Sequence, residues 1–235
     1  SHLAAILGIT GASYTLVGDG AVGLLALRMA EDLMANPELD RCLVVGAEEL
    51  DALLCDAYRT WRLLRDAPPI EPFAQPPRGT LLSEGAGAIL LAREGEVMVE
   101  GVEPGGNYLR RGELVRRLET MAASLTNGVA ANLFVASANG TFVDDAERRM
   151  AAKFFPKAAV YTPKPAFGES IAAGGIWQTI CAAQALRRQE LPPLLGKTPT
   201  LGLTTAERPA GEPWERAVIT SCGMNQQFAG LALRR

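Results

Sequence analysis

Short strand-like runs and longer helix-like runs alternate along the whole chain. Residues 20–35 are apolar on nearly every side at their start, and residues 169–187 are mostly apolar, which is typical of helices buried inside a domain. Residues 41–46 form a continuous apolar run between turn signals, as expected for a parallel strand covered on both faces. The other expected strands are 13–17, 85–93, 96–102, 132–138, 158–163, 217–223 and 228–235, and the other expected helices are 49–64, 110–124 and 143–154. This alternation predicts an α/β fold with mostly buried strands.

Turn-forming residues divide the chain into two parts. Residues 66–80 are rich in proline and are expected to form a loop. Around the glycine pair at 105–106 the pattern of strands and helices starts again. We therefore expect two structural parts, residues 1–104 and residues 105–235.

The two apolar helices begin in a similar way. Gly18 and Asp19 precede the first, and Gly168 and Glu169 stand at the start of the second. This similarity indicates a fold built from two duplicated halves. The chain opens directly into a helix-like pattern at 1–8 with no strand before it. We therefore expect the N-terminal part of the first half to be absent from this chain.

Composition and charge exclude several classes of function. The 235 residues are 48% hydrophobic and 21% charged, with a net charge of −3, and no run of Lys and Arg exceeds two residues. Nucleic-acid binding therefore has little electrostatic support. No apolar stretch approaches the roughly 20 residues of a membrane span, and no signal peptide is visible at the start. These features predict a cytoplasmic protein.

The cysteines do not form a recognisable metal site. Cys42, Cys55, Cys181 and Cys222 contain no CxxC pair, and His2 is the only histidine. Structural zinc sites need such closely spaced ligands, so we expect no metal and no other cofactor.

Six short motifs follow one another in an order that resembles the β-ketoacyl-ACP synthases. They are HLAAILGITGAS (2–13), LVVGAEE (43–49), SEGAGAILL (83–91), SANGT (137–141), TPKPAFGESIAAGG (162–175) and ALRRQELPP (185–193). The resemblance covers essentially the whole chain, from the middle of the family's N-terminal half to its C-terminus. It implies a thiolase-like fold, in which α, β, α, β and α layers are built from duplicated halves.

The departures from this family fall on its catalytic positions. The family has a cysteine at the turn before the first buried helix and two assisting histidines, and these positions are matched by Gly20, Asn139 and Glu169. Only the family's lysine is retained, as Lys164. An amide does not take up a proton near neutral pH, and an ionised carboxylate repels a developing enolate. We therefore expect no catalytic residues and no condensing activity in this chain.

The acidic residues near these positions have structural interpretations. Asp19 is expected to cap the helix that begins at Gly20. Glu169 is expected to cap the second buried helix or to form an ion pair with Lys164. Glu84 is expected to be a buried structural carboxylate held by hydrogen bonds.

The resemblance implies a subunit similar to a chain length factor, which pairs with an active ketosynthase in polyketide, aryl-polyene or fatty-acid-like biosynthesis. The turn Gly18-Asp19-Gly20 before the first buried helix is called the elbow. In the family, the strand before the elbow pairs with its counterpart across a pseudo-two-fold axis. The expected interface residues are therefore Ser13, Tyr14, Thr15, Leu16 and Val17. The expected assembly is a heterodimer, and acyl carrier protein is a further candidate partner.

Two other functions remain open at this stage. In one, the chain is a thiolase-fold enzyme with altered acyl-transfer chemistry that uses Cys222. This residue begins the segment CGMNQ, which stands where the family has a G-F-G-G loop, and it is the one candidate reactive thiol. In the other, the chain is a homodimeric scaffold without activity that binds acyl carrier protein.

Overall fold

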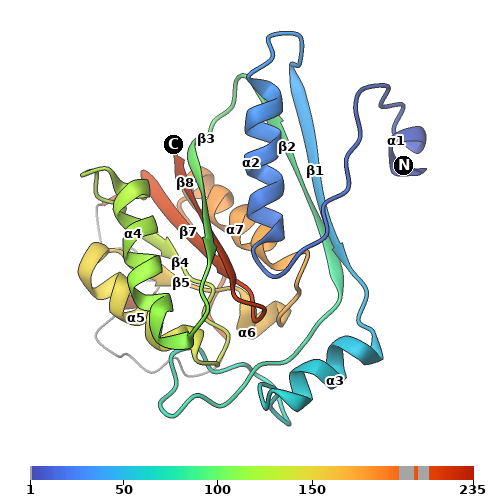
Figure 1. The fold of residues 1–235 in the computed structure, drawn as a ribbon. Coiled ribbons are helices and arrows are strands. Elements are labelled where there is room, and N and C mark those ends of the chain that lie inside the picture. Colours follow the sequence, from blue (N-terminus) through green and yellow to red (C-terminus); the bar gives the residue numbers. More distant parts are fainter. Residues whose placement is uncertain (1, 196–203, 206–211) are drawn as a thin grey trace.

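A computed structural model describes residues 2–195, 204–205 and 212–235 (Figure 1). The helices are α1 (His2–Ile6), α2 (Val22–Met34), α3 (Ala52–Thr60), the 3-10 helix η1 (Arg111–Glu113), α4 (Leu114–Thr126), α5 (Val143–Phe154), α6 (Lys164–Phe167) and α7 (Gly174–Arg188). The strands are β1 (Arg41–Glu48), β2 (Gly85–Ala92), β3 (Met98–Asn107), β4 (Leu133–Val135), β5 (Ala159–Tyr161), β6 (Thr204–Thr205), β7 (Arg216–Cys222) and β8 (Gln227–Arg234).

The strands form two sheets of unequal size. The larger sheet has six strands in the order β3-β8-β7-β4-β5-β6, and the smaller sheet contains β1 and β2. In the larger sheet β4 runs parallel to β5 and β7, whereas β8 runs antiparallel to β7 and β3. The smaller sheet is an antiparallel pair.

The sheets and helices stack in layers, with α2 and α7 between the two sheets (Figure 1). One hydrophobic core lies between α4, α5 and the larger sheet, and includes Leu118, Met150 and Phe134. The other core joins α2 and α7 to the opposite face of that sheet and to β1. These four layers, α-β-α-β, correspond to the expected thiolase-like order without its last helical layer. On the outer face of the smaller sheet, Val45 and Leu90 are exposed.

The two buried helices pack directly against each other, as a duplicated fold requires. A Cβ atom on Gly23 of α2 would lie 3.2 Å from the backbone nitrogen of Ile176 in α7. A Cβ atom on Gly175 of α7 would lie 3.5 Å from the side chain of Leu24 in α2. The small residues at the start of each helix therefore permit this close contact.

The sequence predicted most of these elements. The expected helix at 143–154 coincides with α5, and the last two expected strands become β7 and β8. The expected helices at 49–64 and 169–187 are shorter, because α3 ends at Thr60 and α7 begins only at Gly174. The expected boundary at residue 104 lies within β3, which pairs with β8, so the division into two parts stays a prediction.

Three local predictions were wrong. The run at 41–46 is not a parallel strand covered on both faces, because β1 pairs antiparallel with β2 and its outer side chains are exposed. Residues 13–17 are extended but are not a strand, because no other strand of the described chain lies hydrogen-bonded beside them. Glu84 is exposed at the start of β2, where its Oε2 accepts a hydrogen bond from the backbone N–H of Leu50 at 3.3 Å.

None of the helices in the described ranges has the length and apolar character needed to cross a bilayer.

Candidate functional site

The turn that leads into α2 is closed by a second turn, the one between β7 and β8. Gly20, at the expected nucleophile position, is buried there. A Cβ atom on Gly20 would lie 3.0 Å from the Cα of Gly223 and 3.2 Å from the carbonyl oxygen of Cys222. The φ angle of Gly20 is not positive, so its missing side chain serves this close approach rather than a special backbone conformation. A nucleophilic side chain at this position would need the neighbouring turn to move.

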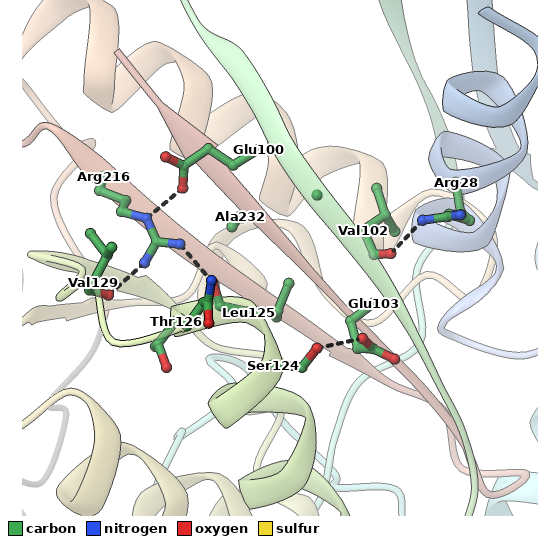
Figure 2. A pocket seen from close by; sticks show the side chains of 12 residues that line it. Arg28, Glu100, Val102, Glu103, Ser124, Leu125, Thr126, Val129, Arg216 and Ala232 are labelled. Carbon is green, nitrogen blue, oxygen red and sulfur yellow. Dashed lines mark hydrogen bonds and ion pairs between the residues drawn. The ribbon is translucent and has the colours of Figure 1, made fainter. Parts of the chain in front are cut away.

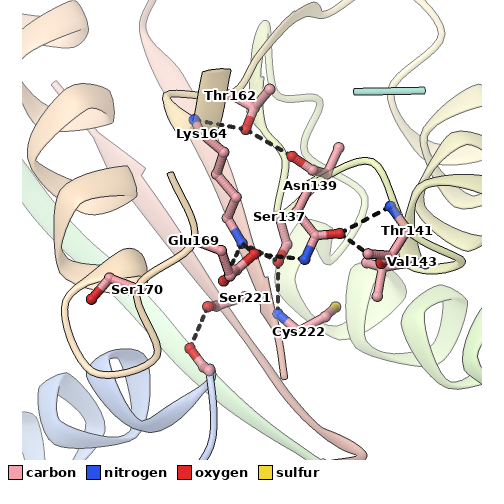
Figure 3. A network of polar contacts seen from close by, with 12 residues as sticks. Ser137, Asn139, Thr141, Val143, Thr162, Lys164, Glu169, Ser170, Ser221 and Cys222 are labelled. Atoms are coloured by element: carbon pink, nitrogen blue, oxygen red, sulfur yellow. Dashed lines mark hydrogen bonds and ion pairs between the residues drawn. The ribbon is translucent and has the colours of Figure 1, made fainter. Parts of the chain in front are cut away.

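A buried ion pair occupies the interior next to this turn (Figure 3). Lys164 Nζ lies 2.8 and 2.6 Å from the two carboxylate oxygens of Glu169, and the side chains are only 3% and 4% exposed. The ion pair expected between these residues is therefore present. Lys164 Nζ also donates a hydrogen bond to Ser137 Oγ at 3.3 Å. Such a pair is tolerated in a buried place because each charge has its partner and further hydrogen bonds.

Asn139 joins this ion pair from the segment after β4. Its side-chain Nδ2 donates a hydrogen bond to Glu169 Oε2 at 2.5 Å. Its Oδ1 accepts hydrogen bonds from the backbone N–H and the hydroxyl of Thr141, at 3.2 and 2.6 Å. Both ends of the amide are thus engaged within the protein. The structure brings Asn139, Lys164 and Glu169 into contact, and all three residues are buried.

Two further buried carboxyl groups hold the backbone around this network. Asp144 accepts hydrogen bonds from the backbone N–H groups of Phe73, Asn139 and Gly140, at 2.6, 2.9 and 3.0 Å. Burial raises the pKa of Asp144 to about 6, although these hydrogen bonds oppose the shift. The hydrogen bonds to Asp144 thus hold the backbone of the segment that carries Asn139.

Glu147 lies one helical turn further along α5 and is also fully buried. It accepts hydrogen bonds from the backbone N–H of Ser137 at 2.9 Å and from the hydroxyl of Thr220. Burial raises the pKa of Glu147 to about 8. Asp144 and Glu147 were not singled out from the sequence. Their D-x-x-E spacing is the signal for them, because residues three apart lie on the same side of a helix.

Neither expected helix cap is present. The N-cap positions of α2 and α7 are Ala21 and Ala173, and neither makes a side-chain cap hydrogen bond. Asp19 instead accepts a hydrogen bond from the backbone N–H of Asn225 at 2.7 Å, in the β7–β8 turn. Glu169 lies five residues before α7, and its carboxylate is held by the ion pair. Asp19 is thus held by a distant part of the chain, and Glu169 by a lysine five residues before it.

Cys222 lies at the end of β7 and is only 1% exposed. Its backbone N–H donates a hydrogen bond to Ser137 Oγ at 2.9 Å. Burial raises the pKa of the Cys222 thiol well above its usual value, and the nearby Glu147 acts in the same direction. Because the thiolate is the nucleophilic form, this environment opposes a catalytic role for Cys222.

Residues 13–17, the expected interface, are exposed along their whole length. The exposed fraction is 58% for Tyr14, 38% for Leu16 and 95% for Val17. This extended segment leads from α1 to the elbow along one side of the molecule (Figure 1). It therefore presents apolar side chains and unpaired backbone groups to the surroundings.

Two cavities lie beside the β7–β8 turn, and the walls of both include Trp61, Met224 and Asn225. The larger has a volume of about 530 Å³ and reaches Asp19 at the elbow. The smaller has a volume of about 330 Å³ and is lined by Arg111, whose guanidinium stacks on a phenylalanine ring. Neither wall includes the buried ion pair.

A third cavity of about 460 Å³ lies between α2, β3 and α4 (Figure 2). Its charged groups are already paired. Arg216 binds Glu100 and the carbonyl oxygens of Leu125 and Val129, and Ser124 donates a hydrogen bond to Glu103. In the ranges that the structure describes, His, Cys, Asp and Glu side chains form no group of three or more able to hold a metal ion.

Comparisons with known proteins agree with this fold. Residues 1–96 match the β-ketoacyl synthase N-terminal domain family. Over 105 residues the chain is 31% identical to the polyketide biosynthesis malonyl-ACP decarboxylase PksF of Bacillus subtilis (strain 168). That match covers 41% of this chain and 25% of PksF. The matched part of the chain thus spans about a quarter of the length of this curated relative.

Solved structures match over nearly the whole chain. The ishigamide ketosynthase/chain length factor superimposes with a TM-score of 0.77 at 18% identity, covering 94% of this chain and 60% of that one. The oxazolomycin ketosynthase domain OzmH KS7 of Streptomyces albus JA3453 superimposes with a TM-score of 0.83 at 18% identity, covering 99% of this chain and 48% of that one. This chain therefore has the thiolase-like ketosynthase fold, its residues 1–96 are similar to the β-ketoacyl synthase N-terminal domain, and it spans about half of the ketosynthase structures it resembles.

Proposed function

We propose that the chain is a catalytically silent ketosynthase-like subunit, of the chain length factor type, that acts in polyketide biosynthesis. The observation that supports this proposal is how the residues at the three expected catalytic positions are packed and hydrogen-bonded. Gly20 is packed against Gly223, and Asn139 and Glu169 bond to each other and to Lys164. These contacts leave no nucleophile at Gly20, and they direct donors of Asn139 and Lys164 to the Glu169 carboxylate rather than to a developing enolate.

The partner of such a subunit is an active β-ketoacyl synthase. The exposed segment 13–17 offers a surface of suitable chemistry, because it is extended, apolar and without hydrogen-bonded neighbours in the described chain. An extended segment of this kind gains backbone hydrogen bonds when a second strand lies beside it. The similarity to the ishigamide ketosynthase/chain length factor, a pair of this type by its name, favours a heterodimer. Acyl carrier protein is the second proposed partner.

The test is co-expression with the β-ketoacyl synthase encoded nearest to it, followed by native mass spectrometry. We expect a one-to-one heterodimer that Val17→Asp disrupts and Val129→Asp leaves intact. Val129 is a matched control, because it is also an exposed valine, with 57% of its surface accessible, and lies on the far side of the larger sheet. A monomer that never associates would overturn the proposal, and a stable homodimer would favour the scaffold alternative.

The similarity to a malonyl-ACP decarboxylase favours a second candidate, decarboxylation of a malonyl thioester. Such a reaction needs donors for the enolate but no nucleophilic cysteine. In this chain Asn139 and Lys164 are donors, yet both already bind Glu169. Measuring carbon dioxide release from malonyl-ACP separates the two candidates. We expect no release from the purified chain above the rate of the Lys164→Met variant.

A further inference from the structure

Two side chains fasten the elbow to the β7–β8 hairpin. Asp19 accepts a hydrogen bond from the backbone N–H of Asn225 at 2.7 Å, and it also accepts from the backbone N–H groups of Gly20 and Gln227. The hydroxyl of Ser221 in β7 donates a hydrogen bond to the carbonyl oxygen of Gly20 at 2.7 Å. The elbow is therefore held by side chains on both of the segments that meet there.

Glycines allow these two turns to come so close. A Cβ atom on Gly223 would lie 1.9 Å from Asp19 Oδ2, a distance that no side chain can tolerate. A Cβ atom on Gly20 would press on the same turn at 3.0 Å. The carboxylate of Asp19 thus occupies the space beside Gly223. The close contact between the elbow and the β7–β8 turn requires glycine at both position 20 and position 223.

The segment before the elbow has no comparable attachment. In the described part of the chain, no hydrogen bond or ion pair holds residues 10–18 to the rest of the molecule. The segment is exposed throughout, and Val17, two residues before Asp19, is 95% exposed. The attachment nearest to this segment is therefore at its C-terminal end, where Asp19 holds the elbow.

We propose that Asp19 is a positioning residue for association: by fastening the elbow to the β7–β8 turn, it holds segment 13–17 ready for the partner subunit. This inference rests on the proposed function, which assigns that segment to the interface. A segment already fixed in its bound direction loses less conformational freedom on binding than a mobile one. Removal of Asp19 therefore weakens association without removing any atom of the segment that touches the partner.

The experiment compares Asp19→Ala and Asp19→Asn with the matched control Asp51→Ala. Asp51 also accepts a backbone hydrogen bond, from the N–H of Leu54 at 2.7 Å, but it caps α3 and does not touch the elbow. Two quantities are measured on each full chain: the dissociation constant for the co-purified ketosynthase, and the backbone order parameters of residues 13–17 by NMR.

Loss of a charged hydrogen bond is expected to raise the dissociation constant about tenfold in Asp19→Ala, with a smaller rise in Asp19→Asn. The order parameters of residues 13–17 should fall from about 0.8 toward 0.6 in Asp19→Ala and stay unchanged in Asp51→Ala. Unchanged order parameters in Asp19→Ala would overturn the inference, and so would a mobile segment in the unmodified protein.

The two readouts separate the inference from the proposed function. If the unmodified chain binds no ketosynthase, the proposed function fails, and the order parameters still decide whether Asp19 fixes the segment. If the unmodified chain binds and Asp19→Ala binds equally well, the proposed function stands and the positioning role is wrong.

Discussion

Glu147 should make the free energy of unfolding of the protein fall as the pH rises from 6 to 8. The side chain is fully buried, and its Oε2 has no hydrogen-bond partner in the described structure. Burial raises its pKa from 4.5 to about 8. At pH 7 the folded protein therefore holds a proton on this carboxyl group, whereas the unfolded chain has released it.

The sign and the size of the effect follow from this difference. Because the pKa is raised on folding, the stability that protonated Glu147 contributes is complete below pH 4.5 and is lost as the pH rises through about 8. Between these values each pH unit lowers the free energy of unfolding by about 1.4 kcal/mol. From pH 6 to pH 8 the loss amounts to about 2 kcal/mol, since ionisation in the folded state reduces the last part of it.

The assay is urea unfolding at pH 6, 7 and 8, followed by tryptophan fluorescence, for the unmodified chain, Glu147→Gln and Glu94→Gln. Glutamine stays neutral, so the free energy of unfolding of Glu147→Gln should fall by about 2 kcal/mol less over this range. The exposed Glu94 serves as the control and should follow the unmodified chain. Asp144, with a pKa of about 6, contributes equally to all three proteins and cancels in the comparison. Parallel curves for the unmodified chain and Glu147→Gln would refute the reasoning.

Three other changes have clear expected outcomes. Gly20→Cys should give no condensing activity in a radiolabelled malonyl-ACP assay, and should lower the free energy of unfolding by about 1–3 kcal/mol, because its Cβ would press on Gly223 at 3.0 Å. Lys164→Met should cost about 3–5 kcal/mol in urea unfolding by leaving Glu169 buried without its partner, and adding Glu169→Leu should recover most of that loss. Cys222 should resist iodoacetamide in the folded protein and react only in urea, as peptide mass mapping would reveal, since it is buried and its pKa is raised.

Predictions from the sequence succeeded where the signal is local. The first turns of α2 and most of α7 are apolar, and this pattern alone placed the two helices in the interior. The ion pair was predictable because Lys164 and Glu169 are five residues apart and a buried charge needs an opposite one. Charge type and close spacing were sufficient in that case.

The failures share a dependence on distant partners. Asp19 resembles a helix cap in sequence, but its carboxylate accepts a hydrogen bond from the backbone N–H of Asn225, near the other end of the chain. The apolar run of β1 does not reveal whether one or both of its faces are covered, because that depends on which elements pack on it. The extended segment 13–17 has strand-like composition, yet a strand also needs a neighbour, and the described chain supplies none.

Each residue at the three expected catalytic positions is held by its own contacts, which argues against gaining condensing activity by a single substitution. Restoring a histidine at Glu169 would leave Lys164 buried without its carboxylate and Asn139 without its acceptor. Restoring a cysteine at Gly20 would displace the turn that Asp19 holds. Each residue is thus accommodated by contacts that the catalytic residue of the family would break. The same contacts pair Lys164 with Glu169 and hold Asp19 against the β7–β8 turn, which supports the proposal of a silent site. Under that proposal, the exposed segment before the elbow is where we expect a partner to associate.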